Sequence, residues 1–135
     1  MFDWKERYSV GVKEIDEQHK QLLSIGRELV SVLENTSEGL DQYDEIKRLI
    51  KKLHEYTVHH FDFEEKMMAE RNFIDLASHS FQHKIFIKKI EDIDLEKIDL
   101  NQKGYTLEIL DFLASWISNH ILKIDHKYIP IFNEN

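Results

Sequence analysis

Hydrophobic residues recur with a helical period in four segments of the chain, at about residues 16–35, 41–71, 75–94 and 105–128. Within each segment the inner positions follow in steps of three and four, which places them on one face of an α-helix. Four amphipathic helices with short connections favour an all-α, antiparallel up-down-up-down four-helix bundle. The predicted stripes are Ile15, His19, Leu22, Gly26, Leu29 and Leu33; Ile46, Ile50, Leu53, Thr57, His60, Glu64 and Met67; Leu76, His79, His83, Phe86, Ile90 and Ile93; and Leu110, Leu113, Ile117, His120 and Ile124.

The residues between these stripes predict the ends and the connections of the helices. Residues 1–14 carry too many large apolar side chains for a disordered leader, so we expect an ordered arm that covers one end of the core. Gly11 predicts a turn before the first helix, and residues 35–39 predict a turn after it. Residues 95–103 are polar and predict a loop, and Pro130 is expected to end the fourth helix.

Composition restricts the class of protein. Hydrophobic residues make up 41% of the 135 positions and charged residues 33%, which suits a single domain over residues 1–135. The net charge of −8 argues against a nucleic-acid phosphate surface and against an anionic membrane surface. The absence of cysteine excludes disulfides, iron–sulfur clusters and thiolate zinc sites. With neither a secretory signal at the N-terminus nor an apolar run that could span a bilayer, a cytoplasmic location is the expectation.

The placement of the histidines carries most of the chemical information. Five of the eight fall on the predicted inner stripes, and burying a polar ring without a partner costs about 1–3 kcal/mol. Five isolated buried rings would strain a domain that is stabilised by only about 5–15 kcal/mol, so these rings need common partners. A metal centre would supply them. The five are His19, His60, His79, His83 and His120.

The depth of these positions along the helices supports one shared site. His19 lies early in the first segment, His60 and Glu64 lie late in the second, and the other inner histidines lie early in the third and late in the fourth. In an antiparallel bundle all of them fall at the same end. His60 and Glu64 are four residues apart on one face, and such a pair alone is most often a surface ion pair, but imidazole and carboxylate together suit iron, manganese or zinc. Three histidines fall off the stripes and are expected on the surface or around the site: His54, His59 and His126.

Four motifs in order along the chain resemble those of the hemerythrin family, in its stand-alone bacterial type, over nearly the whole length. Tyr8–His19 reads YSVGVKEIDEQH and resembles the family's approach to the first helix. His60–Glu65 reads HFDFEE and resembles its His-Phe-x-x-Glu-Glu motif. His79–His83 reads HSFQH and resembles its His-x-x-x-His motif. Trp116–Asp125 reads WISNHILKID and resembles its final Trp-x-x-x-His-x-x-x-x-Asp motif.

The resemblance implies a centre of two non-haem iron ions that binds dioxygen reversibly. By resemblance, Glu64 and Asp125 bridge the irons together with one oxo or hydroxo oxygen, and counting the ligands leaves one position open for dioxygen on the iron with two histidines. The implied oxygen pocket is formed by Phe61, Trp116 and Ile117. The implied iron ligands are His79, His83 and His120 on one iron, His19 and His60 on the other, and Glu64 and Asp125 on both.

The expected function is therefore oxygen transport, storage or buffering by a protein that is not an enzyme. A di-iron oxidase, a reductase of nitric oxide or peroxide, and an oxygen or redox sensor module are the alternatives. Protein partners stay unknown from the sequence. Asp125 lies five residues after His120, so either the helix is locally distorted or Asp125 reaches in from the helix end. The chain also carries Asn72-Phe73 where family members often have Tyr-Pro.

Overall fold

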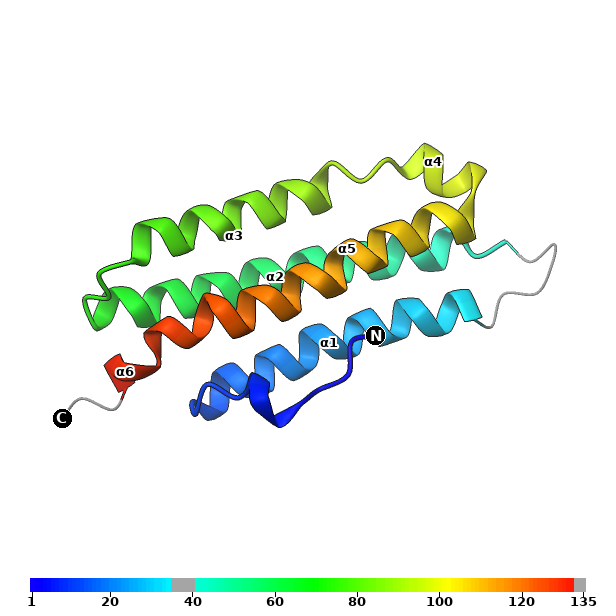
Figure 1. Cartoon of the computed structure of the whole chain (residues 1–135). Coiled ribbons are helices and arrows are strands. Elements are labelled where there is room, and N and C mark those ends of the chain that lie inside the picture. Colours follow the sequence, from blue (N-terminus) through cyan, green and yellow to red (C-terminus); the bar gives the residue numbers. More distant parts are fainter. Residues whose placement is uncertain (35–40, 133–135) are drawn as a thin grey trace.

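The computed structural model describes residues 1–34 and 41–132, and no strand occurs within those two ranges. Four long helices lie side by side and alternate in direction along the chain, which confirms the predicted all-α bundle (Figure 1). They are α1 (Lys13–Glu34), α2 (Tyr43–Glu70), α3 (Leu76–Glu91) and α5 (Gln102–Lys123). None of the helices in the described part of the chain is long and apolar enough to cross a membrane.

The predicted stripes form the interior of the bundle. Every stripe position on α1 and α2 is buried, including the polar side chains of His19, Thr57, His60 and Glu64. On α3 and α5 the stripe is buried except at its ends: Leu76 is half-buried, and so are Ile93 and Ile124, which lie just past the last residues of α3 and α5. The steps of three and four therefore predicted correctly which face of each helix packs inward.

The connections differ from the prediction in two places. Residues 95–103 are not a loop, because Asp94 accepts hydrogen bonds from the backbone N–H groups of Glu96 and Lys97 and so starts a short helix, α4 (Leu95–Leu100). Pro130 does not end the fourth helix: α5 already ends at Lys123, and Pro130 lies inside a final turn, α6 (Ile129–Phe132). The turn predicted at residues 35–39 lies outside the described residues.

The N-terminal arm is ordered. It runs along the side of the bundle (Figure 1), and near α1 its residue Val10 packs into the smaller apolar cluster at one end. Gly11 has a φ of +77°, a left-handed conformation that glycine adopts readily, and this turn leads into α1. The arm contains a short 3-10 helix, η1 (Glu6–Tyr8), and Tyr8 shares a hydrogen bond with Ser118 of α5. Farther along, Phe2 packs on Gly26 in the middle of α1, where a larger residue would leave no room for the ring.

The apolar core is divided into two parts. The larger cluster fills the middle and one end of the bundle and includes Leu29, Leu53, Phe86 and Leu113. A smaller cluster at the other end consists of Val10, Ile15, Met67, Met68 and Tyr128. His19 and Glu64 each lie one helical turn inward from a member of the smaller cluster, so the polar positions at this end are enclosed by apolar side chains on both sides.

Candidate metal centre

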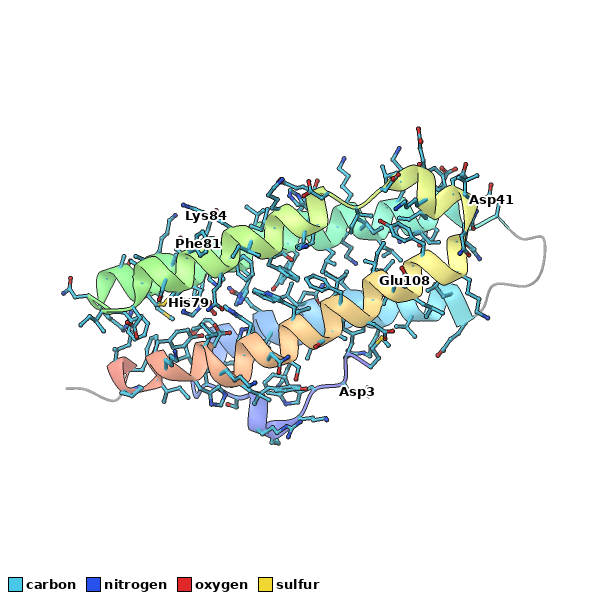
Figure 2. The ribbon with its side chains drawn as sticks, turned by 45° about the horizontal axis from the view of Figure 1, so that its top comes forward. Asp3, Asp41, His79, Phe81, Lys84 and Glu108 are labelled. Carbon is cyan, nitrogen blue, oxygen red and sulfur yellow. The ribbon has the colours of Figure 1, made fainter. Side chains whose placement is uncertain are left out.

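All seven side chains predicted as ligands are buried and meet at one place in the bundle. Each of the four long helices supplies at least one of them, and Asp125 comes from the 3-10 turn η2 (Asp125–Tyr128) that follows α5. Figure 2 shows His79 on the inner side of α3, with Phe81 and Lys84 on its outer side. The seven side chains are at most 5% exposed: His19, His60, Glu64, His79, His83, His120 and Asp125.

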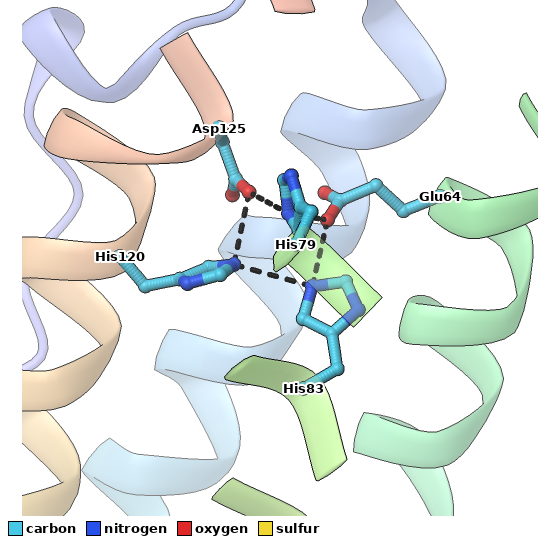
Figure 3. A group of neighbouring side chains, drawn as sticks. All are labelled: Glu64, His79, His83, His120 and Asp125. Atoms are coloured by element: carbon cyan, nitrogen blue, oxygen red, sulfur yellow. Dashed lines mark hydrogen bonds and ion pairs between the residues drawn. The ribbon is translucent and has the colours of Figure 1, made fainter. Parts of the chain in front are cut away.

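Five of these side chains form one compact set of donor atoms, which we call the three-histidine group (Figure 3). The Nε2 atom of each ring points toward the carboxylate oxygens at the centre. Ligands at adjacent corners of an octahedron with metal bonds of about 2.1 Å lie about 3.0 Å apart, so the spacing fits a metal ion. The separations are 3.0 Å for His79 Nε2 to Glu64 Oε1 and to Asp125 Oδ1, 3.1 Å for His83 Nε2 to Glu64 Oε1, 3.0 Å for His120 Nε2 to Asp125 Oδ1, and 3.2 Å for His83 Nε2 to His120 Nε2.

The second set, which we call the two-histidine group, contains His19, His60 and Glu64. His60 Nε2 lies 3.4 Å and His19 Nε2 lies 3.7 Å from Glu64 Oε2, and His19 Nε2 lies 3.1 Å from Asp125 Oδ2. Each carboxylate therefore turns one oxygen toward the three-histidine group and the other toward the two-histidine group. Carboxylates placed in this way can serve two metal ions at once.

The buried polar atoms of this cluster also indicate that a ligand belongs among them. His19 Nε2 and Asp125 Oδ2 are only 3.1 Å apart, yet neither forms a properly aligned hydrogen bond within the described residues. Two buried polar atoms in contact but out of alignment are expected when both point at a third atom between them. The cluster thus fits a group that its donor atoms share, and imidazoles with carboxylates are donors that suit iron.

Asp125 reaches the cluster from the helix end, which decides between the two possibilities left open by its five-residue spacing. The α-helix stops at Lys123, and Ile124 caps it by donating its backbone N–H to the carbonyl of His120 at 2.9 Å. The tighter turn of η2 then directs Asp125 into the bundle. The turn between α2 and α3, where the chain has Asn72-Phe73, is formed by a left-handed Asn72 with a φ of +55°. Phe73 then packs edge-on against Tyr128.

Three of the rings are held through their second nitrogen by polar side chains to which the sequence analysis assigned no role. Gln18 Oε1 lies 2.7 Å from His60 Nδ1, Glu65 Oε2 lies 3.0 Å from His83 Nδ1, and Gln82 Oε1 lies 3.3 Å from His120 Nδ1. Such bonds fix the tautomer and aim Nε2 at the centre. Each of these residues directly neighbours a predicted ligand in the sequence but supports a ring on another helix, and this adjacency was the available signal.

Aromatic stacking fixes the remaining freedom of the three-histidine group. His83 stacks on Phe61, with ring centroids 3.7 Å apart, and His120 stacks on Trp116 at 4.4 Å. The third ring, His79, stacks on Tyr128 at 5.8 Å. The sequence analysis did not predict that Tyr128 belongs to the site. It is fully buried, and its hydroxyl donates a 3.0 Å hydrogen bond to Glu64 Oε2.

The electrostatics of the cluster follow from burial opposed by pairing. Burial alone would raise the pKa of Glu64 and Asp125, but the surrounding imidazoles outweigh it and hold both pKa values well below the ordinary range. Burial lowers the pKa of His60. It also acts to lower the pKa of His19 and His79, but the adjacent carboxylates of Asp125 and Glu64 prevail and raise both pKa values to about 9. The two anionic carboxylates thus lie beside two rings, His19 and His79, that are cationic at neutral pH.

A small apolar cavity of about 10 Å³ adjoins the cluster, which is about the size that accommodates one water-sized molecule. The three residues predicted to form an oxygen pocket, Phe61, Trp116 and Ile117, all line this cavity. On its polar side it touches His19, His60, His120 and Asp125. The remaining histidines lie outside the cluster: His54 pairs with Glu91 at 3.0 Å, His59 is exposed, and His126 is half-buried in η2.

The fold and the site together define a four-helix-bundle protein with a buried histidine–carboxylate centre suited to a metal. The family model described as the hemerythrin HHE cation binding domain matches residues 10–132. The chain therefore belongs to the hemerythrin family.

Comparison with individual proteins agrees with this family assignment. The chain is 38% identical to a bacteriohemerythrin of Clostridium acetobutylicum, over 96% of this chain and 99% of the relative. It is 31% identical to a hemerythrin-like protein of Naegleria fowleri, over 94% of this chain and 90% of the relative. A crystal structure of wild-type hemerythrin superimposes with a TM-score of 0.81, at 25% identity and 98% coverage of both chains.

Proposed function

We propose that the chain binds two non-haem iron ions at this cluster and binds dioxygen reversibly beside them, for oxygen transport, storage or buffering. The observation that carries the proposal is the division of the cluster. Two carboxylates each offer one oxygen to a three-histidine group and one to a two-histidine group. The apolar cavity lies against both rings of the two-histidine group, where a small ligand would enter.

The residues that would hold the iron follow from the two groups. His79, His83 and His120 would hold one ion, His19 and His60 the other, and Glu64 and Asp125 both. Iron supplies the coordination position and the reversible electron exchange with dioxygen that side chains lack. The chain contributes burial, which keeps water from the ions, and rings whose orientation is already set by stacking and by Nδ1 hydrogen bonds.

The balance of ligands favours binding over oxidation of a substrate. Five neutral imidazoles and two carboxylates give a less anionic centre than the carboxylate-rich sites built from Glu-x-x-His motifs. Such a centre stabilises highly oxidised iron less well, so we propose a carrier and not an enzyme. The cavity supports this choice, because a volume of about 10 Å³, about that of one water-sized molecule, leaves no room for an organic substrate.

The apolar wall of the cavity has a second role in this proposal. Phe61 and Ile117 are at most 3% exposed and offer no polar atom to a guest. Water and small anions lose strong hydrogen bonds when they enter such a space, whereas apolar dioxygen is only weakly hydrated and loses little. The wall would therefore favour dioxygen over competing ligands and slow the loss of the reduced state. A cytoplasmic location is part of the same proposal, and fractionation of the source cells would test it.

The test is to load the protein anaerobically with ferrous iron and to record its visible spectrum while it is cycled between oxygen and argon. A carrier develops an absorption band under oxygen that disappears under argon over repeated cycles. An oxidase or reductase would instead consume an added reductant at a sustained rate, which would refute the carrier. His60→Ala and Glu64→Ala should each lose iron, whereas His59→Ala, an exposed neighbour on the same helix, should keep it.

A further inference from the structure

The hydrogen bonds to the rings of the cluster are of two chemical kinds. His60 and His120 are supported by amide oxygens, those of Gln18 and Gln82. His83 alone among the described cluster rings is supported by a carboxylate, that of Glu65, at 3.0 Å from Nδ1. Both Glu65 and His83 belong to the side of the cluster where the three histidines gather.

The carboxylate has a different effect from the amides because it is charged. A hydrogen bond from Nδ1–H to a carboxylate is roughly twice as strong as one to a neutral acceptor. It draws the proton away from the ring and so makes Nε2 a stronger electron donor toward a metal. Amide oxygens orient their rings equally well but transfer much less charge.

The surroundings leave the charge of Glu65 available to His83. Within the described residues Glu65 forms its ion pair with His83 and with no lysine or arginine. Its side chain is 29% exposed and lies between α2 and α3, so the bond is partly shielded from solvent. His83 Nδ1 is meanwhile turned away from the metal-facing atoms, because Nε2 lies 3.1 Å from Glu64 Oε1.

We propose that Glu65, acting through His83, makes the three-histidine group the tighter of the two metal positions, so that it fills first. The inference rests on the proposed function, since it requires a cluster that holds two metal ions. Glu65 is a positioning residue in this account: it touches no metal itself, and it sets the electron donation of the ring that does. A protein with a firmly held first ion could retain half of its centre when iron is scarce.

The experiment is a titration of the metal-free protein with Co²⁺ under anaerobic conditions, followed by calorimetry and by the visible absorption of the bound ion. The unmodified chain should take up two ions per chain in two resolved steps. Glu65→Gln keeps an oxygen that can accept the same hydrogen bond and removes only the charge. It should weaken the first step 10- to 100-fold, in line with the effect of losing such a partner, and leave the second unchanged.

Two further variants separate charge from structure. Glu55→Gln removes the same charge from an exposed position on the same helix and should change neither step. Gln82→Glu places a second carboxylate against a ring of the three-histidine group and should strengthen the first step. In the zinc-loaded protein, Glu65→Gln should also shift the NMR resonance of the His83 Nδ1 proton upfield, a change that a purely structural role of Glu65 would not produce.

The outcomes distinguish this inference from the proposed function. The unmodified chain could bind two ions while the first step of Glu65→Gln equals that of Glu55→Gln. That result would overturn the role of Glu65 and leave the two-metal centre intact. Fewer than two ions in the unmodified chain would overturn both. If Glu65→Gln fails to fold, which circular dichroism reveals, Gln82→Glu decides alone: an unchanged first step overturns the inference.

Discussion

Tyr128 shows how much a single residue outside the predicted set contributes to the site. Its ring stacks on His79, and its hydroxyl donates to Glu64, so it holds one ring and one carboxylate of the centre together. Burial raises the pKa of Tyr128 well above its ordinary value, which keeps the hydroxyl protonated and able to donate. The residue also belongs to the apolar cluster that closes this end of the bundle.

Removing that hydroxyl should destabilise the metal-free protein measurably. Tyr128→Phe leaves the ring in place but deprives the buried Glu64 carboxylate of a donor, and a hydrogen bond to a charged group contributes about 1.5–3 kcal/mol. The free energy of unfolding in urea should fall by that amount. Tyr8→Phe is the matched control, because the Tyr8 hydroxyl bonds the neutral Ser118 at 3.1 Å and should contribute only about 1 kcal/mol. Equal losses in the two variants would contradict the assigned role.

At the scale of single residues, the inner histidines could be predicted from the sequence, but the side chains that bind their Nδ1 atoms could not. Helical register identifies which side chains point inward, and it placed His60 in the interior and His59 on the surface. The partners of Nδ1 depend on how far one helix is rotated and shifted against the next. The hydrogen bond between Gln18 on α1 and His60 on α2 therefore depends on how these two helices pack.

At the scale of the elements, the arm and α1 depend on each other through Gly26. An alanine at this position would place its Cβ against the ring of Phe2, which therefore has to move. Arg27 holds the same part of the arm by donating to the Phe2 carbonyl at 2.7 Å. Glycine inside a helix is otherwise unfavourable relative to alanine by about 1 kcal/mol, so its presence here is explained by the close approach of the arm.

This dependence gives a prediction that changes sign with the background. Gly26→Ala should lower the free energy of unfolding when Phe2 is present. In a Phe2→Ala protein the same substitution should raise it by about 0.5–1 kcal/mol, because only the gain in helix propensity remains. Urea denaturation of the unmodified protein, the two single variants and the double variant measures both effects. Stabilisation by Gly26→Ala in both backgrounds would show that Phe2 does not occupy this position.

The ends of the elements were less predictable than their existence. The periodic stripes gave the four long helices, but α5 stops at Lys123 with no glycine or proline at that point to predict it. The break follows from tertiary demand, since Asp125 has to turn inward to the cluster. In the same way, the cap that starts α4 depends on one side chain, Asp94, in a stretch whose overall polarity resembles a loop.

At the scale of the whole molecule, the cluster makes stability depend on pH. His19 and His79 have folded-state pKa values of about 9, above the ordinary value of 6.5. Their protonation therefore stabilises the fold fully below about pH 6.5, and this contribution is lost as the pH rises through 9. Glu64 and Asp125, whose pKa values are low, do not add to this change, because their contribution to stability is lost only at acidic pH.

The stability of the metal-free protein should therefore depend on pH in this range much more than that of the iron-loaded protein. Between pH 7 and 9.5 the free energy of unfolding of the metal-free protein should decrease. The extra stability conferred by iron should increase over the same range, because bound metal requires neutral imidazoles and displaces the two protons. Urea denaturation of both forms at several pH values measures this. A metal-free protein whose stability is constant or rises over this range would contradict the assigned charge balance.

The central claim concerns the whole centre, and the amount of dioxygen released by the iron-loaded protein tests it most directly. After saturation with oxygen and removal of the free gas, evacuation should release one molecule of dioxygen for every two iron ions, again after each reloading. His59→Ala should behave identically, and His60→Ala should release none. A protein with two irons per chain that releases no dioxygen, or that releases it after His60 has been removed, would contradict the account.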